Sequence, residues 1–568
     1  MKFNEMKYER PSLDDYKKKF IDIIENIKNA KDYNEFKSLF FEFDKQLQHI
    51  STLSTLCSIR NSINTTDEFY EKETAFWDES MPSLLEYSSD FIKAIFASKF
   101  IDELKKDVSH TFFKQAENEL KSYSSEIVED LVIENKLGTE YSKLLASAKI
   151  EFDGEIKNLA QMGVYATNTD RNIRKEAALA TSKFFLDNES KFDRIFDELV
   201  KVRTRIAKKL GFNSFTELAY VRMNRLDYNQ NDVERYRKEI IKYVLPVVKK
   251  IYDAQSKRIG IDELMAYDLG LKFIDGNAKP TGTPEEILEA GRKMYHELSP
   301  ETSEFIDLMI DNELMDVLAK PGKRTGGYMT FLPDYGVSFI FSNFNGTSGD
   351  VDVLTHEAGH AFQGYQSKGI IHEQNSTVHM PTMESCEIHS MSMEFITWPW
   401  MEYFFGDKAD KYRFSHICSG IEFLPYGVEV DHFQHEVYNN PDMTPDERKA
   451  LWAKLDKIYR PYHNFEGNEL LERGCWWFRQ AHIFNSPFYY IDYTLAQVCA
   501  FQFWKRIHVD KDETAWNDYL AICKCGGTKS FTEIVKLANL KNPFKEGALE
   551  EVISAIDKYI EENKSKFE

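Results

Sequence analysis

Hydrophobic positions in the first half of the chain recur with the spacing of α-helices. Between Leu13 and about Asp275, apolar residues fall three or four positions apart, with charged residues between them and few glycines. Residues 15–29, 67–77 and 232–256 show this pattern most clearly. Such spacing predicts amphipathic helices, each of which buries one face. We therefore expect this half to be built from successive helices.

The pattern changes near residue 276. Two loops rich in Gly, Pro and Thr, residues 276–284 and 320–327, interrupt the helical spacing. The second loop precedes two strand-like segments, residues 328–331 and 337–344, which are joined by a Pro-Asp-Tyr-Gly turn at residues 333–336. These features predict a small sheet inserted in a helical protein.

Composition and charge exclude several classes of protein. The 568 residues carry a net charge of −21, which argues against binding to nucleic acids or to anionic membranes. No stretch of 18 residues lacks charge and the first residues have no apolar core, so we expect a soluble cytoplasmic protein without a signal peptide. The seven cysteines are scattered and odd in number, which is typical of reduced thiols. The pair Cys523 and Cys525 has no second pair to complete a zinc site.

One segment of the second half carries a metal-binding pattern. Residues 347–350 have the character of a capping box at a helix start, and Val353, His356, Glu357 and His360 follow at the spacing of one helical face. Two histidines one turn apart can bind one Zn²⁺ through their ring nitrogens, and the glutamate between them can act as a general base on water. This HExxH motif favours a zinc peptidase.

Zinc in such a site needs a third protein ligand, and the next segment offers candidates. Glu384, Glu387 and Glu394 share one face of a predicted helix whose flanks are apolar. Carboxylates in such surroundings repel one another unless a cation or protonated histidines neutralise them. The residues alone leave both Glu384 and Glu387 open as the third ligand.

A third segment carries hydrogen-bond donors. His482 precedes Tyr490, Tyr493 and Gln497, which lie on one helical face. Phenol and imidazolium groups can stabilise the oxyanion that develops when a peptide carbonyl is attacked. Taken alone, the segment is equally well interpreted as a tyrosine-rich core helix.

Other sequence candidates are weaker. His432 and His435 have a possible metal spacing, but no third ligand lies at a suitable spacing, so we interpret them as part of a helix face or a substrate cleft. No GxSxG nucleophile signature occurs in the sequence.

The metal-binding segments together resemble the thimet oligopeptidase and oligoendopeptidase F family of zinc metallopeptidases. After the HEAGH helix, Glu387, Ser390 and Glu394 match the family's Glu-x-x-Ser-x-x-x-Glu pattern, which implies Glu387 as the third ligand. The distance from His360 instead favours Glu384, which is kept as the alternative ligand and is otherwise expected to support a ligand histidine.

The segment from His482 to Phe503 is similar to the corresponding part of the same superfamily, in which His-Ile, Pro, Tyr-x-x-Tyr and Phe-Gln-Phe follow in this order. The resemblance implies that Tyr493 is the oxyanion donor and that Tyr490 and His482 are further donors to the substrate carbonyl.

The resemblance also implies an architecture. It predicts a mainly α fold in which two helical subdomains enclose a deep substrate channel, with a small β-sheet beside the zinc helix. We expect an N-terminal helical region over residues 1–180 and a catalytic zinc metallopeptidase domain over residues 181–568.

The implied activity is cleavage of internal bonds in short unstructured peptides, with one Zn²⁺ per chain. The peptide is expected to be held partly by β-like pairing with the strand at residues 337–344. One alternative is a zinc carboxypeptidase or dipeptidyl carboxypeptidase, which would hold the substrate carboxylate with a cation such as Lys323, Arg324 or Arg479. The other alternative is a catalytically silent peptide-binding protein.

Overall fold

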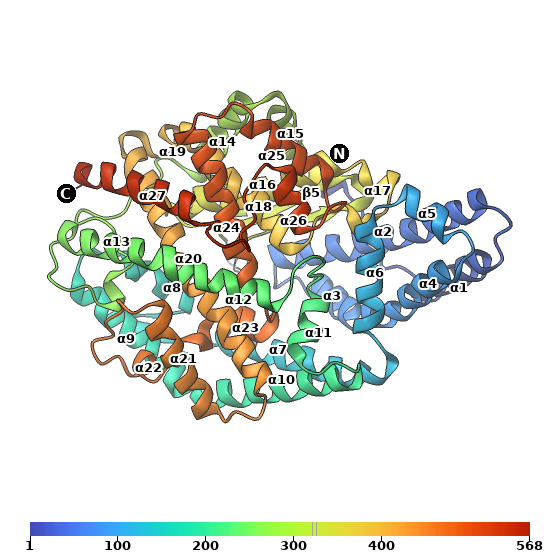
Figure 1. Cartoon of the computed structure of the whole chain (residues 1–568), viewed down its shortest axis with the longest axis horizontal. Helices are drawn as coiled ribbons and strands as arrows, with labels where there is room; N and C mark the ends of the chain where they lie inside the picture. The colour runs from blue at the N-terminus through green and yellow to red at the C-terminus, as the bar shows by residue number, and fades with distance from the viewer. Residues whose placement is uncertain (321, 325, 568) are drawn as a thin grey trace. The chain divides into compact units, whose positions relative to one another are not determined.

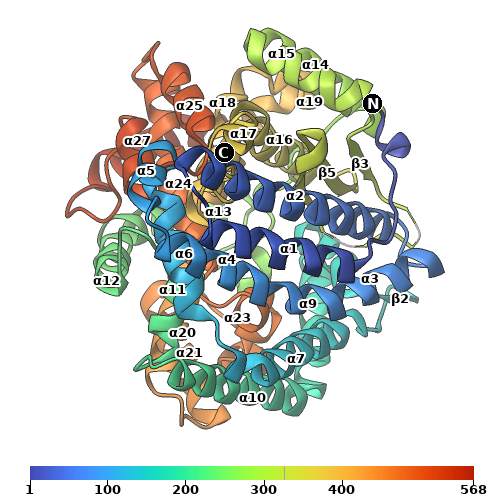
Figure 2. The same ribbon diagram turned by 90° about the vertical axis from the view of Figure 1, so that its right-hand side faces the viewer.

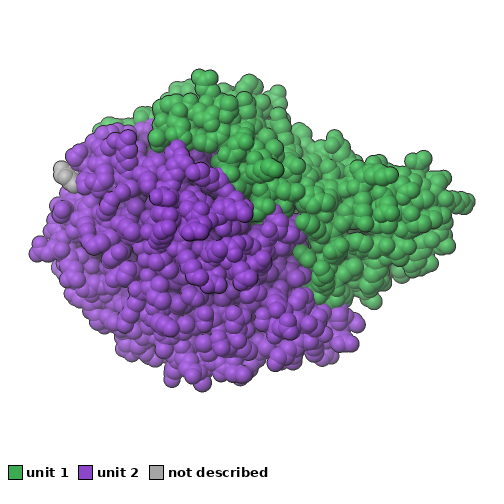
Figure 3. Space-filling model, in the orientation of Figure 1, with its two compact units in different colours: residues 1–123, 279–407, 506–540 green, residues 124–278, 408–505, 541–568 purple. Residues whose placement is uncertain are grey.

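The computed structural model describes residues 1–320, 322–324 and 326–567, and it divides into two compact units, which Figure 3 distinguishes by colour. Unit 1 comprises Met1–Tyr123, Lys279–Asp407 and Arg506–Leu540, and unit 2 comprises Ser124–Ala278, Lys408–Lys505 and Lys541–Glu568. Each unit is therefore assembled from three separate stretches of the chain. The division into residues 1–180 and 181–568 stays a prediction.

Unit 1 consists of helices and one three-stranded sheet (Figures 1 and 2). Its elements are α1 (Leu13–Lys28), α2 (Tyr33–Ile63), α3 (Glu68–Ser80), α4 (Leu85–Ala97), α5 (Ile101–Asp107), α6 (His110–Ser122), α14 (Pro284–Leu298), α15 (Pro300–Asp311), β3 (Met315–Leu318), β4 (Tyr328–Leu332), β5 (Val337–Phe344), α16 (Gly349–Ser367), α17 (Ile370–Glu373), α18 (Met383–Ile396), α19 (Glu402–Phe405), α25 (Ala515–Cys525) and α26 (Phe531–Leu537).

The first helices of unit 1 pack around phenylalanines, as their amphipathic spacing predicts. Figure 2 shows α1 and α2 side by side, and the two helices are in contact. Phe20, Phe40, Phe43 and Phe91 are buried between these helices and α4, and the rings of Phe43 and Phe91 stack with centroids 3.8 Å apart. Aromatic burial of this kind dominates the energetics of a helical core.

The sheet of unit 1 has the strand order β3-β5-β4. Strand β4 is antiparallel to β5, with Tyr328 opposite Phe341, and the turn between them contains Gly336 at a φ of +61°, which favours glycine. Strand β3 is parallel to β5 on its other side. The predicted hairpin is therefore confirmed, but β5 is the central strand, paired with β4 over Val337–Phe341 and with β3 over Ile340–Phe344.

Lys323 fastens the loop before this sheet. Its ammonium group is fully buried and donates hydrogen bonds to the carboxylate of Asp316 and to the carbonyl oxygens of Leu318 and Ser342. A buried charge needs such partners. Lys323 therefore ties together the ends of β3 and β5.

Unit 2 is also mainly helical, with one two-stranded sheet. Its elements are α7 (Val128–Ala146), β1 (Ile150–Phe152), β2 (Glu155–Lys157), α8 (Leu159–Gly163), α9 (Arg171–Asp187), α10 (Glu189–Lys209), α11 (Phe215–Arg222), α12 (Gln230–Glu239), α13 (Leu245–Arg258), α20 (Ala409–Asn439), α21 (Pro445–Tyr459), α22 (Glu469–Glu472), α23 (Ala481–Asn485), α24 (Tyr490–Trp504) and α27 (Glu550–Asn563).

Two expectations about helix boundaries need correction. The segment predicted as one helix over residues 232–256 is α12 and α13 joined by a π-helical turn at Ile240–Val244, because Pro246 has no N–H to continue the α-helical hydrogen bonds. The predicted capping box at 347–350 is absent. Instead, the Asp350 carboxylate accepts hydrogen bonds from the backbone N–H groups of Asn345 and Gly346 at 2.8 Å each.

The mainly α fold with small sheets is thus confirmed. Among the described residues, none of the helices combines the length and the apolar character required to span a bilayer.

Candidate metal centre and donor cluster

Helices α16 and α18 of unit 1 are in contact (Figure 1). Helix α16 carries the HEAGH motif, and α18 carries Glu384, Glu387 and Glu394. Gly359, in the middle of the motif, lies against the backbone of α18. A Cβ atom at this position would lie 2.7 Å from the carbonyl oxygen of His389 and 2.7 Å from the Cα of Ser390. Such a close approach requires glycine. The two helices therefore touch at the motif itself.

The side chains of His356, His360 and Glu387 converge on one point. The Nε2 atoms of the two histidines lie 3.3 and 3.4 Å from Oε2 of Glu387. The three ligand atoms all lie within 4.8 Å of one another. Ligands bound at about 2.0–2.2 Å to one tetrahedral Zn²⁺ have roughly this spacing. The donor set of two imidazoles and one carboxylate therefore fits a zinc ion.

Neighbouring side chains hold these ligands in place. Oε1 of Glu394 lies 2.7 Å from Nδ1 of His356, and the Ser390 hydroxyl donates to Oε2 of Glu387 at 3.0 Å. A carboxylate at Nδ1 keeps the proton there and leaves the lone pair of Nε2 for a metal. The support expected from Glu384 is thus provided for His356 by Glu394. Glu384 is buried but does not belong to the converging group among the described residues.

The charges of this cluster attract a cation. Burial raises the pKa of Glu387, but the charges and hydrogen bonds of His360 and His356 outweigh burial and hold this pKa well below its usual value. Burial lowers the pKa of His356, but Glu387 and Glu394 outweigh it and raise this pKa well above its usual value. Both shifts show that positive charge between the carboxylates is stabilised.

Glu357 lies beside the ligands on α16 and is 8% exposed. Burial raises the pKa of its carboxyl group, against the opposing effect of His356 and His360. A Cβ atom built on Gly327 would lie 3.8 Å from Oε1 of Glu357. The chain that leads into β4 therefore runs close to the Glu357 carboxylate.

The predicted hydrogen-bond donors form a separate cluster in unit 2. The ring of His482, on α23, lies 4.9 Å from the ring of Tyr490 and 5.7 Å from that of Tyr493, measured between centroids. Nε2 of His482 lies 3.5 Å from the hydroxyl oxygen of Tyr493. The structure thus brings together the three residues on α23 and α24, as it brings together the three predicted metal ligands in unit 1.

A strained residue starts the tyrosine helix. Phe488 has a φ of +68°, which is rare for a bulky side chain. Its backbone N–H donates to Oε1 of Gln434 at 2.9 Å, and Arg225 donates to its carbonyl oxygen at 2.7 Å. Arg225 also forms a buried ion pair with Asp492. These buried contacts hold the first turn of α24, and with it the tyrosines, in place.

The remaining sequence candidates have structural partners. His435 contacts Tyr220 and the carboxylate of Asp431, and His432 contacts the hydroxyl of Tyr459. These contacts support a helix-face interpretation. All seven cysteines are free thiols, and within the described residues neither Cys523 nor Cys525 belongs to a group that could hold a metal ion.

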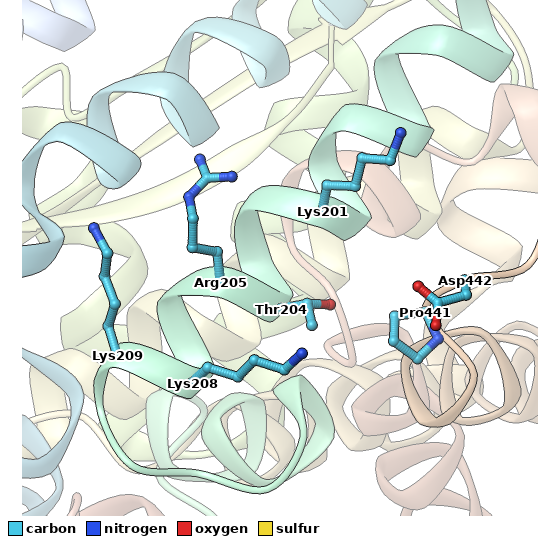
Figure 4. Close-up of a pocket in the computed structure, with 7 residues that line it drawn as sticks. All are labelled: Lys201, Thr204, Arg205, Lys208, Lys209, Pro441 and Asp442. Atoms are coloured by element: carbon cyan, nitrogen blue, oxygen red, sulfur yellow. The ribbon is translucent and has the colours of Figure 1, made fainter.

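A cavity of about 370 Å³ lies at the C-terminal end of α10 (Figure 4). It is lined by Lys201, Thr204, Arg205, Lys208, Lys209, Pro441 and Asp442. Lys201 pairs with Asp197, while Arg205 and Lys209 both pair with Asp130. Cations in the last turn also complement the helix dipole. Carboxylates of the chain itself thus pair with Lys201, Arg205 and Lys209.

Sequence reasoning missed two contacts within these clusters. The spacing of Glu394, seven residues after Glu387, placed it on the ligand face and was the signal for its role beside His356. The contact of Gln480 with His482 had no such signal, because neighbouring residues two apart do not predict a side-chain hydrogen bond.

The fold and the site together define a metallopeptidase, and comparisons with known proteins agree. The family model described as peptidase M3 N-terminal domain matches residues 3–123, and the model of peptidase family M3 matches residues 164–553. The chain belongs to peptidase family M3, in its oligoendopeptidase F group, and is a metallo-oligopeptidase. The resemblance inferred from the motifs is thus confirmed.

Solved structures extend the likeness over the whole chain. A structure described as PZ peptidase A with inhibitor 2 is 48% identical, with a TM-score of 0.94 and 99% of each chain covered. A putative oligoendopeptidase F is also 48% identical, with a TM-score of 0.94 and full coverage of both chains. A putative oligoendopeptidase F from Bacillus anthracis strain Ames is 46% identical, with a TM-score of 0.89 and coverage of 99% and 98%. A search of curated proteins found no match.

Proposed function

We propose that this metallo-oligopeptidase is a zinc-dependent endopeptidase that hydrolyses internal bonds of short, unstructured peptides. The observation that carries the proposal is the convergence of His356, His360 and Glu387, with Glu357 beside them on α16. Two imidazoles and one carboxylate are one of the ligand sets of catalytic zinc sites, which keep a further position open for water or substrate.

The proposed chemistry divides the work between the metal and the chain. Zn²⁺ held by His356, His360 and Glu387 would supply a Lewis acid that activates water and polarises the substrate carbonyl. Glu357 takes a proton from the attacking water at its carboxylate and passes the proton to the leaving nitrogen. The intact carboxylate favours an enzyme over a silent binding protein, because a purely structural metal site does not use such a base.

The donor cluster of unit 2 is proposed to act on the substrate carbonyl. The hydroxyls of Tyr493 and Tyr490 and the imidazole of His482 donate hydrogen bonds to the carbonyl oxygen as it gains negative charge. Their grouping around one point, with the fixed start of α24 behind them, supports this role.

The expected strand pairing of the substrate must be corrected. The strand at residues 337–344 is central, and neighbouring strands pair with most of both its edges, so it offers no continuous free edge for a peptide. Strand β4 has its outer edge without a strand partner among the described residues, and the chain that enters β4 lies next to Glu357. We propose that an extended peptide pairs with β4 instead.

One of the three cations proposed to hold a substrate carboxylate in a carboxypeptidase is not available for that role. Lys323 is fully buried and bound to Asp316 and to backbone oxygens, so it cannot hold a substrate carboxylate. Arg324 and Arg479 are exposed and remain available to that alternative.

The test is mass spectrometry of a peptide pool blocked at both ends, incubated with the zinc-loaded protein or with its Glu357→Gln variant. We expect internal cuts by the wild type, and a rate about 10²–10⁴-fold lower for the variant with zinc retained. Trimming only after the carboxyl ends are freed would identify a carboxypeptidase. Zinc binding with no cleavage of either pool would contradict the peptidase mechanism.

A further inference from the structure

Two histidines of this chain have opposite partners at Nδ1. Nδ1 of His356 faces the Glu394 carboxylate at 2.7 Å, so it must carry a proton. Nδ1 of His482 instead faces the amide nitrogen of Gln480 at 2.7 Å. An amide nitrogen only donates hydrogen bonds, so Nδ1 of His482 must accept with its lone pair. The proton of the neutral imidazole then resides on Nε2.

Both ends of the Gln480 amide have partners. The hydroxyl of Tyr426, on α20, donates to Oε1 of Gln480 at 2.7 Å, and the amide nitrogen faces His482. Burial raises the pKa of Tyr426 to about 12, so this hydroxyl keeps its proton at neutral pH. Tyr426, Gln480 and His482 therefore form a directed chain of donors that ends at Nε2 of His482.

The two tautomers suit different tasks. A metal ligand must present a lone pair at Nε2, which His356 can do when its one remaining proton is held at Nδ1 by Glu394. A donor to a substrate carbonyl must present a hydrogen at Nε2, and this atom of His482 lies on the side of the Tyr493 hydroxyl, at 3.5 Å. A carboxylate next to His482 would favour the wrong tautomer or a charged ring, whereas a neutral amide does neither.

We propose that Gln480, oriented by Tyr426, is a positioning residue that holds His482 as the Nε2–H tautomer, so that His482 donates to the substrate carbonyl oxygen. This inference deepens the proposed function and rests on the role assigned there to His482. Gln480 itself acts only through the imidazole.

The tautomer of His482 determines how its titration affects activity. In the wild type, both the neutral and the charged forms of His482 carry a hydrogen on Nε2, so titration of this ring creates no loss of activity at high pH. In Gln480→Glu the carboxylate accepts from Nδ1–H. Neutral His482 then turns a lone pair toward the carbonyl, and only the imidazolium form donates.

Three tyrosines of unit 2 lie against the ring of His482. They are Tyr489, Tyr490 and Tyr493, and burial raises the pKa of Tyr490 well above its usual value. Arg479 precedes Gln480 and stacks on Trp476 at 4.3 Å. A new carboxylate at position 480 adds a negative charge next to the ring and raises the pKa of His482.

The first experiment compares kcat/KM of the wild type and of Gln480→Glu between pH 6 and pH 9 with a doubly blocked peptide. We expect the ratio of variant to wild type to fall at least about tenfold across this range, because loss of one oxyanion donor costs about 10²–10³-fold when it is complete. In the His482→Leu background, the same substitution should add no pH dependence. A ratio that is flat across the range would overturn the proposal.

The second experiment reads the tautomer directly. In protein labelled with ¹⁵N-histidine, the signals of His482 are assigned by their absence from His482→Leu. We expect Nδ1 to be unprotonated in the wild type and protonated in Gln480→Glu. A protonated Nδ1 in the neutral wild-type ring would refute the proposal, even if the variant does not fold.

The two experiments separate the proposals. A wild type that shows no cleavage dependent on Glu357 contradicts the proposed function, while the ¹⁵N spectrum still decides the tautomer. A wild type that cleaves, combined with a flat activity ratio, contradicts only the role of Gln480.

Discussion

At the scale of single residues, the metal ligands differ in how far local spacing defines them. His356, Glu357 and His360 follow from helical geometry, because residues three and four apart lie on one face. The third ligand does not follow from local spacing. Glu384 and Glu387 are one turn apart, and the sequence does not reveal the path of the segment that joins α16 to α18. Only the packing of the two helices separates them, and it favours Glu387.

Glu387→Gln and Glu384→Gln test this choice. We expect Glu387→Gln to lose most of its zinc in competition with a chelator, because an amide is a poor zinc ligand and Oε2 of Glu387 faces both histidines. Glu384→Gln should keep about one zinc per chain. Metal content by mass spectrometry is the measurement, and the reverse order of zinc loss would assign the ligand to Glu384.

A second residue-scale prediction concerns Glu429 on α20. Burial raises the pKa of this carboxyl to about 8, although Arg460 donates to it at 2.8 Å and opposes the shift. The folded chain therefore holds a proton between about pH 4.5 and pH 8 that the unfolded chain releases. The free energy of unfolding should fall as pH rises through this range, by up to about 1.4 kcal/mol per pH unit.

Glu429→Gln removes this titration. We expect the urea midpoint of the variant to rise relative to that of the wild type as pH rises from 5 to 8. Glu436→Gln, which changes a half-exposed carboxylate of the same helix, serves as the control. A difference between Glu429→Gln and wild type that is constant over the range would show that Glu429 is ionised throughout.

At the scale of elements, the contact between α16 and α18 depends on the absence of a side chain at Gly359. In Gly359→Ala the new Cβ would meet backbone atoms of His389 and Ser390 at 2.7 Å, which cannot move without shifting α18. We expect a loss of about 1–3 kcal/mol in unfolding free energy and weaker zinc binding, because α18 carries Glu387.

Gly369→Ala is the matched control for this contact. Its nearest new neighbour would be the flexible carboxylate of Glu373 at 3.6 Å. We expect this substitution to be neutral or to stabilise by up to about 1 kcal/mol. Urea midpoints and chelator competition are measured for both variants, and equal behaviour would mean that the helix contact does not constrain the metal ligands.

Elements were predicted well where one periodic pattern governs them. The amphipathic spacing gave α1 and α3 within a few residues, and the Pro-Asp-Tyr-Gly turn gave the hairpin of β4 and β5. The central position of β5 could not be predicted, because β3 lies before a loop and pairs in parallel through contacts that no local pattern records. The hydrogen-bond chain from Tyr426 through Gln480 to His482 could not be predicted for the same reason, since Tyr426 lies on a different helix.

At the scale of the whole molecule, unit 1 needs its first helices. Ile370 and Val378 belong to the same core as the phenylalanines of α1 and α2, and the buried Asp44 accepts a hydrogen bond from the N–H of Ser376 at 3.0 Å. The Thr111 hydroxyl donates to the carbonyl of Gly527 at 2.7 Å. Each of these contacts joins segments that are far apart in the sequence.

We therefore expect a fragment of residues 181–568 to lack a cooperative unfolding transition and to bind zinc weakly. Residues 1–180 supplied as a second chain should restore both properties, because they bring back most of the core to which Ile370 and Val378 belong. Circular dichroism and zinc content are the measurements. A fragment that unfolds cooperatively with bound zinc would show that residues 181–568 are an independent domain.

The division of each unit into three chain segments also sets the order in which the molecule can be completed. Helix α25 comes from the last segment of unit 1, packs on α16, and its Tyr519 hydroxyl donates to the carbonyl of His389 on α18. During synthesis, at about 5–20 residues per second, α25 is made several seconds after α16 and α18. A nascent chain that has not yet reached α25 therefore lacks this support for the metal ligands on α16 and α18.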